Sequence, residues 1–545
     1  MKIKSKFLKK LILSVLSSLL LSFGWTDWGT GFVMLIAFVP FLFLIDSLLK
    51  DNCTCKNLKF FGYSCLTTFL WNVMTTWWVS LASIPGGIAS VICYTLFMSC
   101  TMTLSFVILK KFGKRIGYLA FITNWIAYEY VFMNSQIAWP WLILGNAFAN
   151  NIQLIQWYEF TGHIGGTLWI LLVNLVLFEI INLIKNKKSN SSLILNCSLL
   201  SLFLIVPIGY SLIRYYSYKE VGKEIDVVVV QPNIDPYNEK YNELPVEEQM
   251  TIILDLANAV ADENVDYFVA PETAIPSYIW EDEIQDDNCI LYMRSFLQYY
   301  PRSEFLIGAS TRRLYIDGVN KTETARKRRN SGDYYDIYNT SLQIDTSQNI
   351  PLYHKSRLVP GSEIMPYPKT LGFIQDFMFD LGGMTGTCAT QIERTPFKNI
   401  HNHIKVGVPI CYESVFGEFL AEFSKNGANF FAIITNDGWW YNTPGYHQHN
   451  SFARLRAIES RRSIARSANT GISCFINQRG DIIKQLDWQK RDAIRSKITL
   501  NDKVTFFANY GDYIARISCY LSLLVILLLI SNYFKSLFNK KKVLK

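Results

Sequence analysis

The sequence has few charged residues for its length. Charged side chains make up 18% of the 545 residues, whereas apolar residues make up 50% and aromatic residues 15%. A typical soluble domain has about 25% charged residues. The low charge, with a mean hydropathy of +0.15, excludes an ordinary soluble protein of this size. The sequence also has no repeat of 20–50 residues, which excludes a solenoid or a propeller.

Patterns for metal binding and for disulfides are also sparse. The sequence has six histidines, and the close pair His447-x-His449 has no acidic or cysteine partner at ligand spacing. A metal or redox site at Cys53-Thr54-Cys55 is a minor alternative. We therefore expect no metal and no other cofactor. Four of the eleven cysteines lie in the long polar region, and their spacing defines no pairing: Cys289, Cys388, Cys411 and Cys474.

Long apolar runs are the feature that the sequence does have. A helix needs about 20 largely apolar residues to span a bilayer. The first run lacks a following small-x-small cleavage site, so we expect it to be a retained span rather than a signal peptide. The fifth is the weakest, because Asn124, Glu129 and Asn134 interrupt it. The eight runs lie near residues 8–24, 30–49, 60–82, 87–109, 116–134, 164–184, 192–213 and 513–534.

The charges between the runs predict their orientation, because Lys and Arg are retained on the cytoplasmic side. Basic residues cluster before the first run, after the last, and in every second loop. The alternate loops, near 25–29, 83–86 and 135–163, contain neither Lys nor Arg. We therefore expect both termini to be cytoplasmic. The cytoplasmic clusters are Lys2 to Lys10, Lys50 to Lys59, Lys110 to Arg115, Lys185 to Lys188, and Lys535 to Lys545.

This topology predicts four parts. Residues 1–213 form seven transmembrane helices, 214–512 an extracytoplasmic domain, 513–534 an eighth helix and 535–545 a basic cytoplasmic tail. The cytoplasmic clusters hold 20 of the 53 basic residues. The remainder carries 33 basic against 42 acidic residues, and this balance argues against a nucleic-acid partner. For the basic stretch 312–329, a solvated insertion is favoured over binding of anionic lipid headgroups.

The 214–512 region alternates strand-like and helix-like runs, which predicts a sheet layered with helices. The alternation does not distinguish a doubly wound sheet from other layered α/β folds. The helix-like runs are residues 246–262, 285–299, 414–425 and 447–462. The strand-like runs are Ile225–Pro232, Tyr267–Ala270, Glu304–Ser310, Tyr338–Ile344, Lys405–Ile410, Phe430–Thr435 and Gly471–Asn477.

Three residues at predicted strand ends have the chemistry of a thiol nucleophile. Cys411 ends the run Ile404–Cys411, Glu272 follows Val269-Ala270-Pro271, and Lys355 follows Tyr353-His354. A thiolate attacks carbonyl carbon; a nearby ammonium lowers the thiol pKa, and a carboxylate removes the proton. We predict Glu272 as general base and Lys355, with the Tyr412 N–H, as oxyanion stabiliser. The alternative for Cys411 alone is a buried small hydrophobe.

The triad, in this chain order, resembles that of the nitrilase (carbon–nitrogen hydrolase) superfamily. The whole chain, membrane frame included, resembles that superfamily's membrane-bound branch, the apolipoprotein N-acyltransferases. The resemblance implies an αββα sandwich carried by an eight-helix transmembrane bundle. Further matching stretches are Val230–Ile234, Leu358–Glu363, Cys411–Glu413, Thr435–Trp440 and His447–Ile472.

The resemblance also implies supporting residues. Glu363 is expected to orient Lys355 or its water, Glu413 to anchor the nucleophile turn, and Tyr412 to be needed beside it; a structural role is the alternative for each. Trp439, Trp440 and Tyr441 form either a loop that closes over an acyl chain or an aromatic core cluster. The sequence departs from the family pattern at two places. Shortly after the first strand, where family members carry a functional tryptophan, the nearest aromatic residue here is Tyr241. After the lysine, Gly361-Ser362 replaces the usual Phe-Gly.

By resemblance, the reaction is a two-step acyl exchange. Cys411 takes a fatty acyl chain from a glycerophospholipid. The α-amino group of the diacylglyceryl-cysteine of an apolipoprotein then accepts it. Two alternatives remain: a membrane-tethered amidase or nitrilase acting on a small amide, and a transporter or lipid-binding scaffold with an inactive nitrilase domain. For transport, Glu129 and Glu179 are the acidic residues inside the predicted spans.

Overall fold

The computed structural model describes residues 2–26, 28–52, 54–187, 189–329, 331–371 and 387–543. Cys53, Lys188 and Lys545, named in the sequence predictions, lie outside these ranges. The chain divides into two compact units. One comprises residues 1–77, 87–214 and 512–545, and the other comprises residues 78–86 and 215–511.

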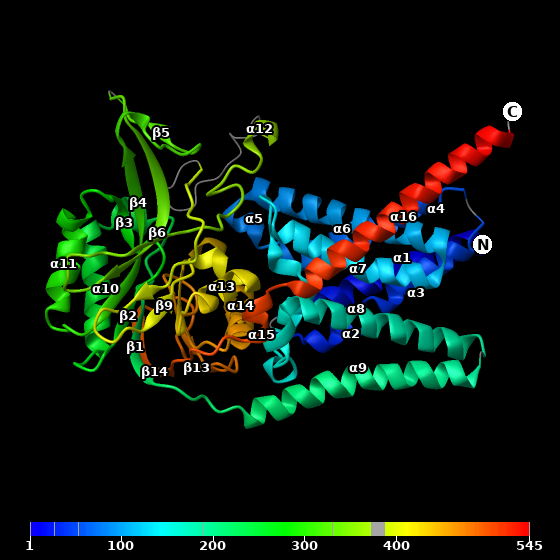
Figure 1. The fold of residues 1–545 in the computed structure, drawn as a ribbon, viewed down its shortest axis with the longest axis horizontal. Helices are drawn as coiled ribbons and strands as arrows, with labels where there is room; N and C mark the ends of the chain where they lie inside the picture. The colour runs from blue at the N-terminus through cyan, green and yellow to red at the C-terminus, as the bar shows by residue number, and fades with distance from the viewer. Residues whose placement is uncertain are drawn as a thin grey trace. The chain divides into compact units, whose positions relative to one another are not determined.

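The first unit is helical (Figure 1). Five helical segments of the described chain are long and apolar enough to cross a membrane: Gly31–Lys50, Ile84–Phe112, Tyr158–Lys185, Asn190–Ser217 and Tyr513–Leu537. The helices are α1 (Lys2–Phe23), α2 (Met34–Ala37), α3 (Val39–Lys50), α4 (Lys56–Thr76), α6 (Ile84–Phe112), α7 (Lys114–Met133), α8 (Tyr158–Lys185), α9 (Asn190–Ser217) and α16 (Tyr513–Val543).

Two acidic side chains inside this unit, Glu129 and Glu179, have hydrogen-bond partners. The Glu129 carboxylate on α7 accepts hydrogen bonds from Trp125 Nε1 at 2.9 Å, from the Leu144 N–H at 2.9 Å and from Thr167 Oγ1 at 2.7 Å. Glu179 on α8 pairs with Lys114 at 2.6 Å and also accepts from Tyr118. These contacts tie α7, α8 and the intervening loop together.

The predicted run at 60–82 does not form a single helix. Helix α4 ends at Thr76, and the following segment, with the short helix α5 (Val79–Ala82), belongs to the second unit. Trp78 explains this assignment. Its buried indole packs against Gly445, where a Cβ would come within 2.6 Å of it, and lies 4.8 Å from the Trp440 ring.

The second unit is an αββα sandwich (Figure 1). The first sheet has the order β14-β1-β2-β4-β6-β5, with β3 beside β4 and β7 beside β6; the second has the order β13-β12-β11-β10-β9-β8. Tyr267 of one sheet meets Phe430 of the other at 5.1 Å between ring centroids. Their strands are β1 (Glu224–Gln231), β2 (Tyr267–Val269), β3 (Ile275–Trp280), β4 (Glu304–Tyr315), β5 (Arg326–Lys327), β6 (Tyr334–Ile344), β7 (Leu352–His354), β8 (Phe397–Lys398), β9 (Lys405–Gly407), β10 (Phe430–Thr435), β11 (Ile464–Ala468), β12 (Cys474–Ile476), β13 (Ile482–Gln485) and β14 (Asp492–Thr499).

Helices cover the outer face of each sheet. In β1 the side chains alternate between faces, and Val228 and Val230 pack in one cluster with Met250 of α10 and Met293 of α11. On the other sheet, Phe423 of α13 lies against Gly407 of β9. These helices are α10 (Val246–Val260), α11 (Asn288–Leu297), α13 (Gly417–Lys425) and α14 (Pro444–Ser460), with the shorter α12 (Pro368–Leu371) and α15 (Phe506–Tyr510) beyond them.

The basic stretch 312–329 begins inside the sheet, so the expectation of a loop insertion is wrong at its start. Strand β4 continues to Tyr315. The Arg312 guanidinium lies 3.9 Å from the Tyr278 ring centroid, and Arg313 pairs with Glu281 at 2.8 Å. Aromatic and acidic partners therefore hold these two arginines on the strand.

Candidate active site

The three residues predicted as a triad come from three different strand ends. Glu272 follows β2, Lys355 follows β7, and Cys411 opens the 3-10 turn Cys411–Val415 beyond β9. The Glu272 turn lies directly on β4 because Gly308 has no side chain. A Cβ there would come within 2.7 Å of the Glu272 Cα and 2.4 Å of the Thr273 N.

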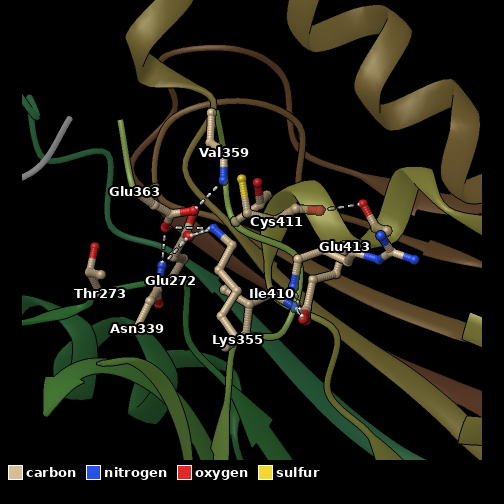
Figure 2. Close-up of polar contacts among 12 residues, drawn as sticks. Glu272, Thr273, Asn339, Lys355, Val359, Glu363, Ile410, Cys411 and Glu413 are labelled. Atoms are coloured by element: carbon tan, nitrogen blue, oxygen red, sulfur yellow. Dashed lines mark hydrogen bonds and ion pairs between the residues drawn. The ribbon is translucent and has the colours of Figure 1, made fainter. Parts of the chain in front are cut away.

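Lys355 lies between two carboxylates (Figure 2). Its Nζ donates to Glu272 Oε1 and to Glu363 Oε1, both at 2.9 Å. All three side chains are almost fully buried. Asn339 of β6 donates Nδ2 to the same two oxygens, at 2.8 and 2.9 Å. Glu363 also accepts from the Val359 N–H at 2.8 Å, so it fixes the loop as well as the lysine.

The mutual attraction decides the charge states of this cluster. Burial alone would raise the pKa of Glu272, but the Lys355 ammonium and its hydrogen bond outweigh burial and hold that pKa below its ordinary value. Burial likewise opposes charge on Lys355, yet Glu272 and Glu363 raise its pKa well above the ordinary value. The site therefore holds an ionised Glu272 and a charged Lys355.

The Cys411 thiol is not activated in the way that the sequence suggested. The expected lowering of the thiol pKa by Lys355 is present, but burial and the Glu272 charge outweigh it, so the net pKa lies well above the ordinary value. A hydrogen bond from Cys411 helps to lower the pKa of Glu272.

Glu413 anchors the nucleophile turn to the lysine loop. One oxygen accepts from the Ile410 N–H at 2.8 Å, just before the cysteine. The other accepts from the Ser356 N–H at 2.6 Å and from Tyr353 OH at 2.9 Å, on either side of Lys355. Cys411 itself has φ of +50°, a left-handed conformation that costs energy for any residue but glycine. The turn therefore needs this support.

The remaining predicted residues lie around the turn. Tyr412 is buried, and its ring packs edge-on against Phe416 at 5.1 Å. The aromatic side chains of the loop Trp439–Tyr441 pack at two different places. Trp440 contacts Trp78 and lies 5.8 Å from the His449 ring, whereas Trp439 and Tyr441 pack on Tyr237 at 5.3 and 5.4 Å. Each of the ten cysteines in the described ranges is a free thiol.

Sequence reasoning missed two residues beside Glu272. One is Asn339, described above. The other is Lys240, which is 3% exposed and donates to Thr273 Oγ1 at 2.7 Å and to the Glu272 carbonyl at 3.4 Å. Burial lowers the pKa of Lys240 to about 8. No local signal singled out Asn339, because the same buried strand also carries Asp336, Thr340, Ser341 and Gln343.

The arrangement can carry out nucleophilic acyl transfer. A carboxylate is placed to take the thiol proton, and a fixed ammonium lies beside the atoms where an oxyanion would form. The half-buried Cys411 thiol has the chemistry of a nucleophile. These parts would serve an ester, an amide or a nitrile alike.

Comparisons with known proteins identify the two halves of the chain. The carbon-nitrogen hydrolase family model matches residues 227–503, just over half of the chain, and the apolipoprotein N-acyltransferase N-terminal domain model matches residues 17–176. A relative from Chlorobaculum tepidum, named apolipoprotein N-acyltransferase, is 28% identical over 93% of this chain and 94% of its own length. A relative of that name from Geobacter metallireducens is 26% identical over 92% of this chain and 92% of its own length. One from Treponema denticola, named apolipoprotein N-acyltransferase 1, is 24% identical over 97% of this chain and 98% of its own length.

Proposed function

Because this chain belongs to the carbon–nitrogen hydrolase family, we propose that it is an acyltransferase that completes lipoprotein maturation in the membrane. It moves a fatty acyl chain from a glycerophospholipid to the α-amino group of the N-terminal diacylglyceryl-cysteine of apolipoproteins. The observation that carries the proposal is the pairing of Lys355 with Glu272 beside Cys411, in a chain whose N-terminal part matches the apolipoprotein N-acyltransferase domain.

In the first step, Glu272 takes the thiol proton while Cys411 Sγ attacks the ester carbonyl of the phospholipid. The oxyanion forms beside the Lys355 ammonium and the Tyr412 N–H. When the intermediate collapses, the C–O bond breaks and the departing alkoxide takes the proton from Glu272. The products are a thioester on Cys411 and a lysophospholipid.

In the second step, the neutral α-amino group of the acceptor attacks the thioester carbon. Glu272 takes a proton from the attacking nitrogen, the C–S bond breaks, and the proton passes to the departing sulfur. The product is an N-acylated, triacylated lipoprotein, and the free thiol is restored. Glu272 serves as base and then as acid in both steps.

The supporting residues receive roles from their contacts. Glu363 and Asn339 hold Lys355 and Glu272 in place, and Glu413 fixes the turn that carries Cys411. We assign Trp439 and Tyr441, which pack on Tyr237, to the substrate-facing loop. Trp440 is a packing residue by its contact with Trp78.

The membrane arrangement belongs to the same proposal. Eight helices span the bilayer, both termini are cytoplasmic, and residues 214–512 lie on the outer face of the bacterial inner membrane. Five of these helices meet the length and hydropathy needed, and the Lys and Arg asymmetry of the loops gives the orientation. A transport role is disfavoured, since Glu129 and Glu179 are both engaged in hydrogen bonds within the helical unit.

The test is an acyl-transfer assay with purified full-length protein. It uses a phospholipid with a radiolabelled acyl chain and a synthetic diacylated lipopeptide with a free N-terminus. We expect label in the lipopeptide and an equal amount of lysophospholipid, and neither with Cys411→Ala. Release of free fatty acid at the same rate with and without lipopeptide would favour the hydrolase alternative, and transfer by Cys411→Ala would refute the proposal.

A further inference from the structure

Behind the nucleophile turn lies a buried network that the proposed chemistry does not use. It consists of Ser414 on the turn, His449 on α14, Asp437 after β10 and Arg466 on β11. Each of the four side chains is at most 1% exposed. The four side chains bond one another and the backbone of Cys411.

The network ends on one backbone atom, the carbonyl oxygen of Cys411. Ser414 Oγ donates to this oxygen at 2.6 Å, and His449 Nε2 lies 3.3 Å from it and 3.1 Å from Ser414 Oγ. A carbonyl oxygen only accepts hydrogen bonds. The contact from His449 is therefore a hydrogen bond when Nε2 carries the proton.

The other end of the network holds the imidazole ring. His449 Nδ1 lies 2.8 Å from Asp437 Oδ1, and the second oxygen of Asp437 accepts from Arg466 at 2.8 Å. The Arg466 amino nitrogen is also 3.2 Å from Nδ1. Burial alone would raise the pKa of Asp437, but Arg466 and His449 outweigh burial and lower it to about 2, so the carboxylate is ionised and accepts. With Nδ1 beside the ionised Asp437, the ring is held so that Nε2 faces Ser414 Oγ and the Cys411 carbonyl.

The position of that carbonyl matters because it belongs to the same peptide group as the Tyr412 N–H. A peptide group is planar and trans, so fixing the oxygen fixes the direction of the N–H on its other side. Donors on the oxygen also polarise the group and strengthen its N–H as a donor. These contacts to the carbonyl oxygen also stabilise the left-handed backbone conformation of Cys411, whose φ is +50°.

We propose that Ser414 and His449, held by Asp437 and Arg466, are positioning residues that aim the Cys411–Tyr412 peptide group as an oxyanion donor. The inference rests on the assignment of Cys411 as nucleophile in the proposed function. It assigns a role to His449, for which the sequence disfavoured a metal site and favoured packing near the active site. It also explains why α14 must stay fixed against the catalytic turn, since His449 of α14 contacts Cys411 and Ser414 of that turn.

Two small reagents separate this role from a structural one. Iodoacetamide alkylates Cys411 by displacement of iodide at a saturated carbon, so no oxyanion forms. p-Nitrophenyl acetate acylates the same sulfur through a tetrahedral oxyanion and releases p-nitrophenolate. In both reactions the thiol proton passes to Glu272. Mass spectrometry of the Cys411 peptide, in full-length detergent-purified protein, measures both rates separately from the other cysteines.

The variants are His449→Leu, His449→Gln, Ser414→Ala and, as a matched control two residues earlier on α14, His447→Leu. The His447 ring is half-buried and packs on Tyr446 at 4.1 Å. We expect His449→Leu to slow acylation by about ten- to a hundredfold with alkylation unchanged. Ser414→Ala should give a smaller loss of the same kind. His449→Gln, which keeps an N–H donor, should recover part of the rate, and His447→Leu should change neither.

The opposite outcomes are equally clear. Equal acylation rates in His449→Leu and wild type, or a parallel fall of acylation and alkylation, would overturn the positioning role. Should His449→Leu fail to fold, Ser414→Ala decides by the same ratio of rates. A wild-type protein that reacts with both reagents yet transfers no acyl chain to the lipopeptide would refute the proposed function and leave this ratio readable.

Discussion

Replacing Lys355 by Met tests the charge arrangement of the site most directly. The substitution removes the ammonium and leaves Glu272 and Glu363 facing each other, both still bonded to Asn339 Nδ2. Removing one partner of a buried ion pair costs about 3–5 kcal/mol. For a unit of roughly 300 residues, this corresponds to a fall in Tm of about 5–8 °C.

The loss should depend on pH in a definite direction. In the wild type, the pKa of Glu272 is held below its ordinary value of 4.5, so its contribution to stability is present above that pH. In Lys355→Met, burial and the facing carboxylate are no longer offset by the ammonium, so the pKa of Glu272 rises. Above pH 4.5 the folded variant then binds more protons than its unfolded chain, so its free energy of unfolding falls as pH rises. The loss of stability relative to wild type therefore grows above pH 4.5 and shrinks on acidification.

A second substitution separates stability from catalysis. In Lys355→Met/Glu363→Gln the repulsion is gone but Glu272 stays buried without an ammonium, so Tm should recover only part of the loss. Thioester formation should remain at least about 10²-fold below wild type, because the oxyanion donor is still missing. The measurements are thermal unfolding in one detergent at pH 5.5 and 8.0, and acid-quenched labelling of Cys411 by radioactive phospholipid. The exposed Lys425→Met on α13 is the control.

Two results would refute this reasoning. One is a Tm for Lys355→Met equal to that of Lys425→Met, since Lys355 would then not compensate two buried charges. The other is recovery of thioester formation in the double variant, since the lysine would then act only by relieving repulsion. In addition, Glu272→Gln/Lys355→Met should be little slower than either single variant, because the two residues act as a unit.

Three further predictions concern the nucleophile, its anchor and the topology. Cys411→Ser should remain folded but abolish turnover, while label on the wild-type enzyme should be released by neutral hydroxylamine; hydroxylamine-resistant label would contradict a thioester. Glu413→Gln should leave at least one backbone N–H of the turn unpaired, at about 1–3 kcal/mol. Burial raises the pKa of Glu413 to about 7. The free energy of unfolding of the wild type should therefore fall between pH 4.5 and 7, and that of Glu413→Gln should not. Equal dependence of the two free energies on pH would contradict the carboxylate anchor. On intact spheroplasts, an impermeant thiol reagent should label Asn320→Cys and spare Cys53 and Cys55; the reverse pattern would invert the topology.

The sequence predicted what is local. Amphipathic runs gave α10 and α13 nearly at their bounds, and apolar runs gave β1, β2 and β10. Strands β11 and β14 were missed, because Arg466, Arg495 and Lys497 interrupt the apolar pattern. Their partners explain these polar residues: Arg466 bonds Asp437 and Arg495 bonds Asp226 at 2.6 Å. Such pairs join residues far apart in sequence, so no local pattern contains them.

The site follows the same division. Glu272, Lys355 and Cys411 each follow an apolar strand and could be found, whereas Asn339 and Lys240 acquire meaning only through contacts with Glu272. The assignment of Trp78 to the second unit likewise depends on the space above Gly445. It could not be read from the hydropathy of residues 60–82.

A neutral resting thiol fits the environment in which we place this site. Susceptibility to oxidation follows thiolate character and exposure, and an outer-face domain meets the oxidising side of the membrane. Burial and the Glu272 charge raise the pKa of Cys411, so the sulfur resists oxidation until a base removes its proton. Glu272 can do so as a bound carbonyl withdraws the developing charge toward Lys355. Activation of the thiol therefore depends on the exact placement of Glu272 and Cys411. Asn339 holds Glu272, and Glu413 and the His449 network hold the turn that carries Cys411.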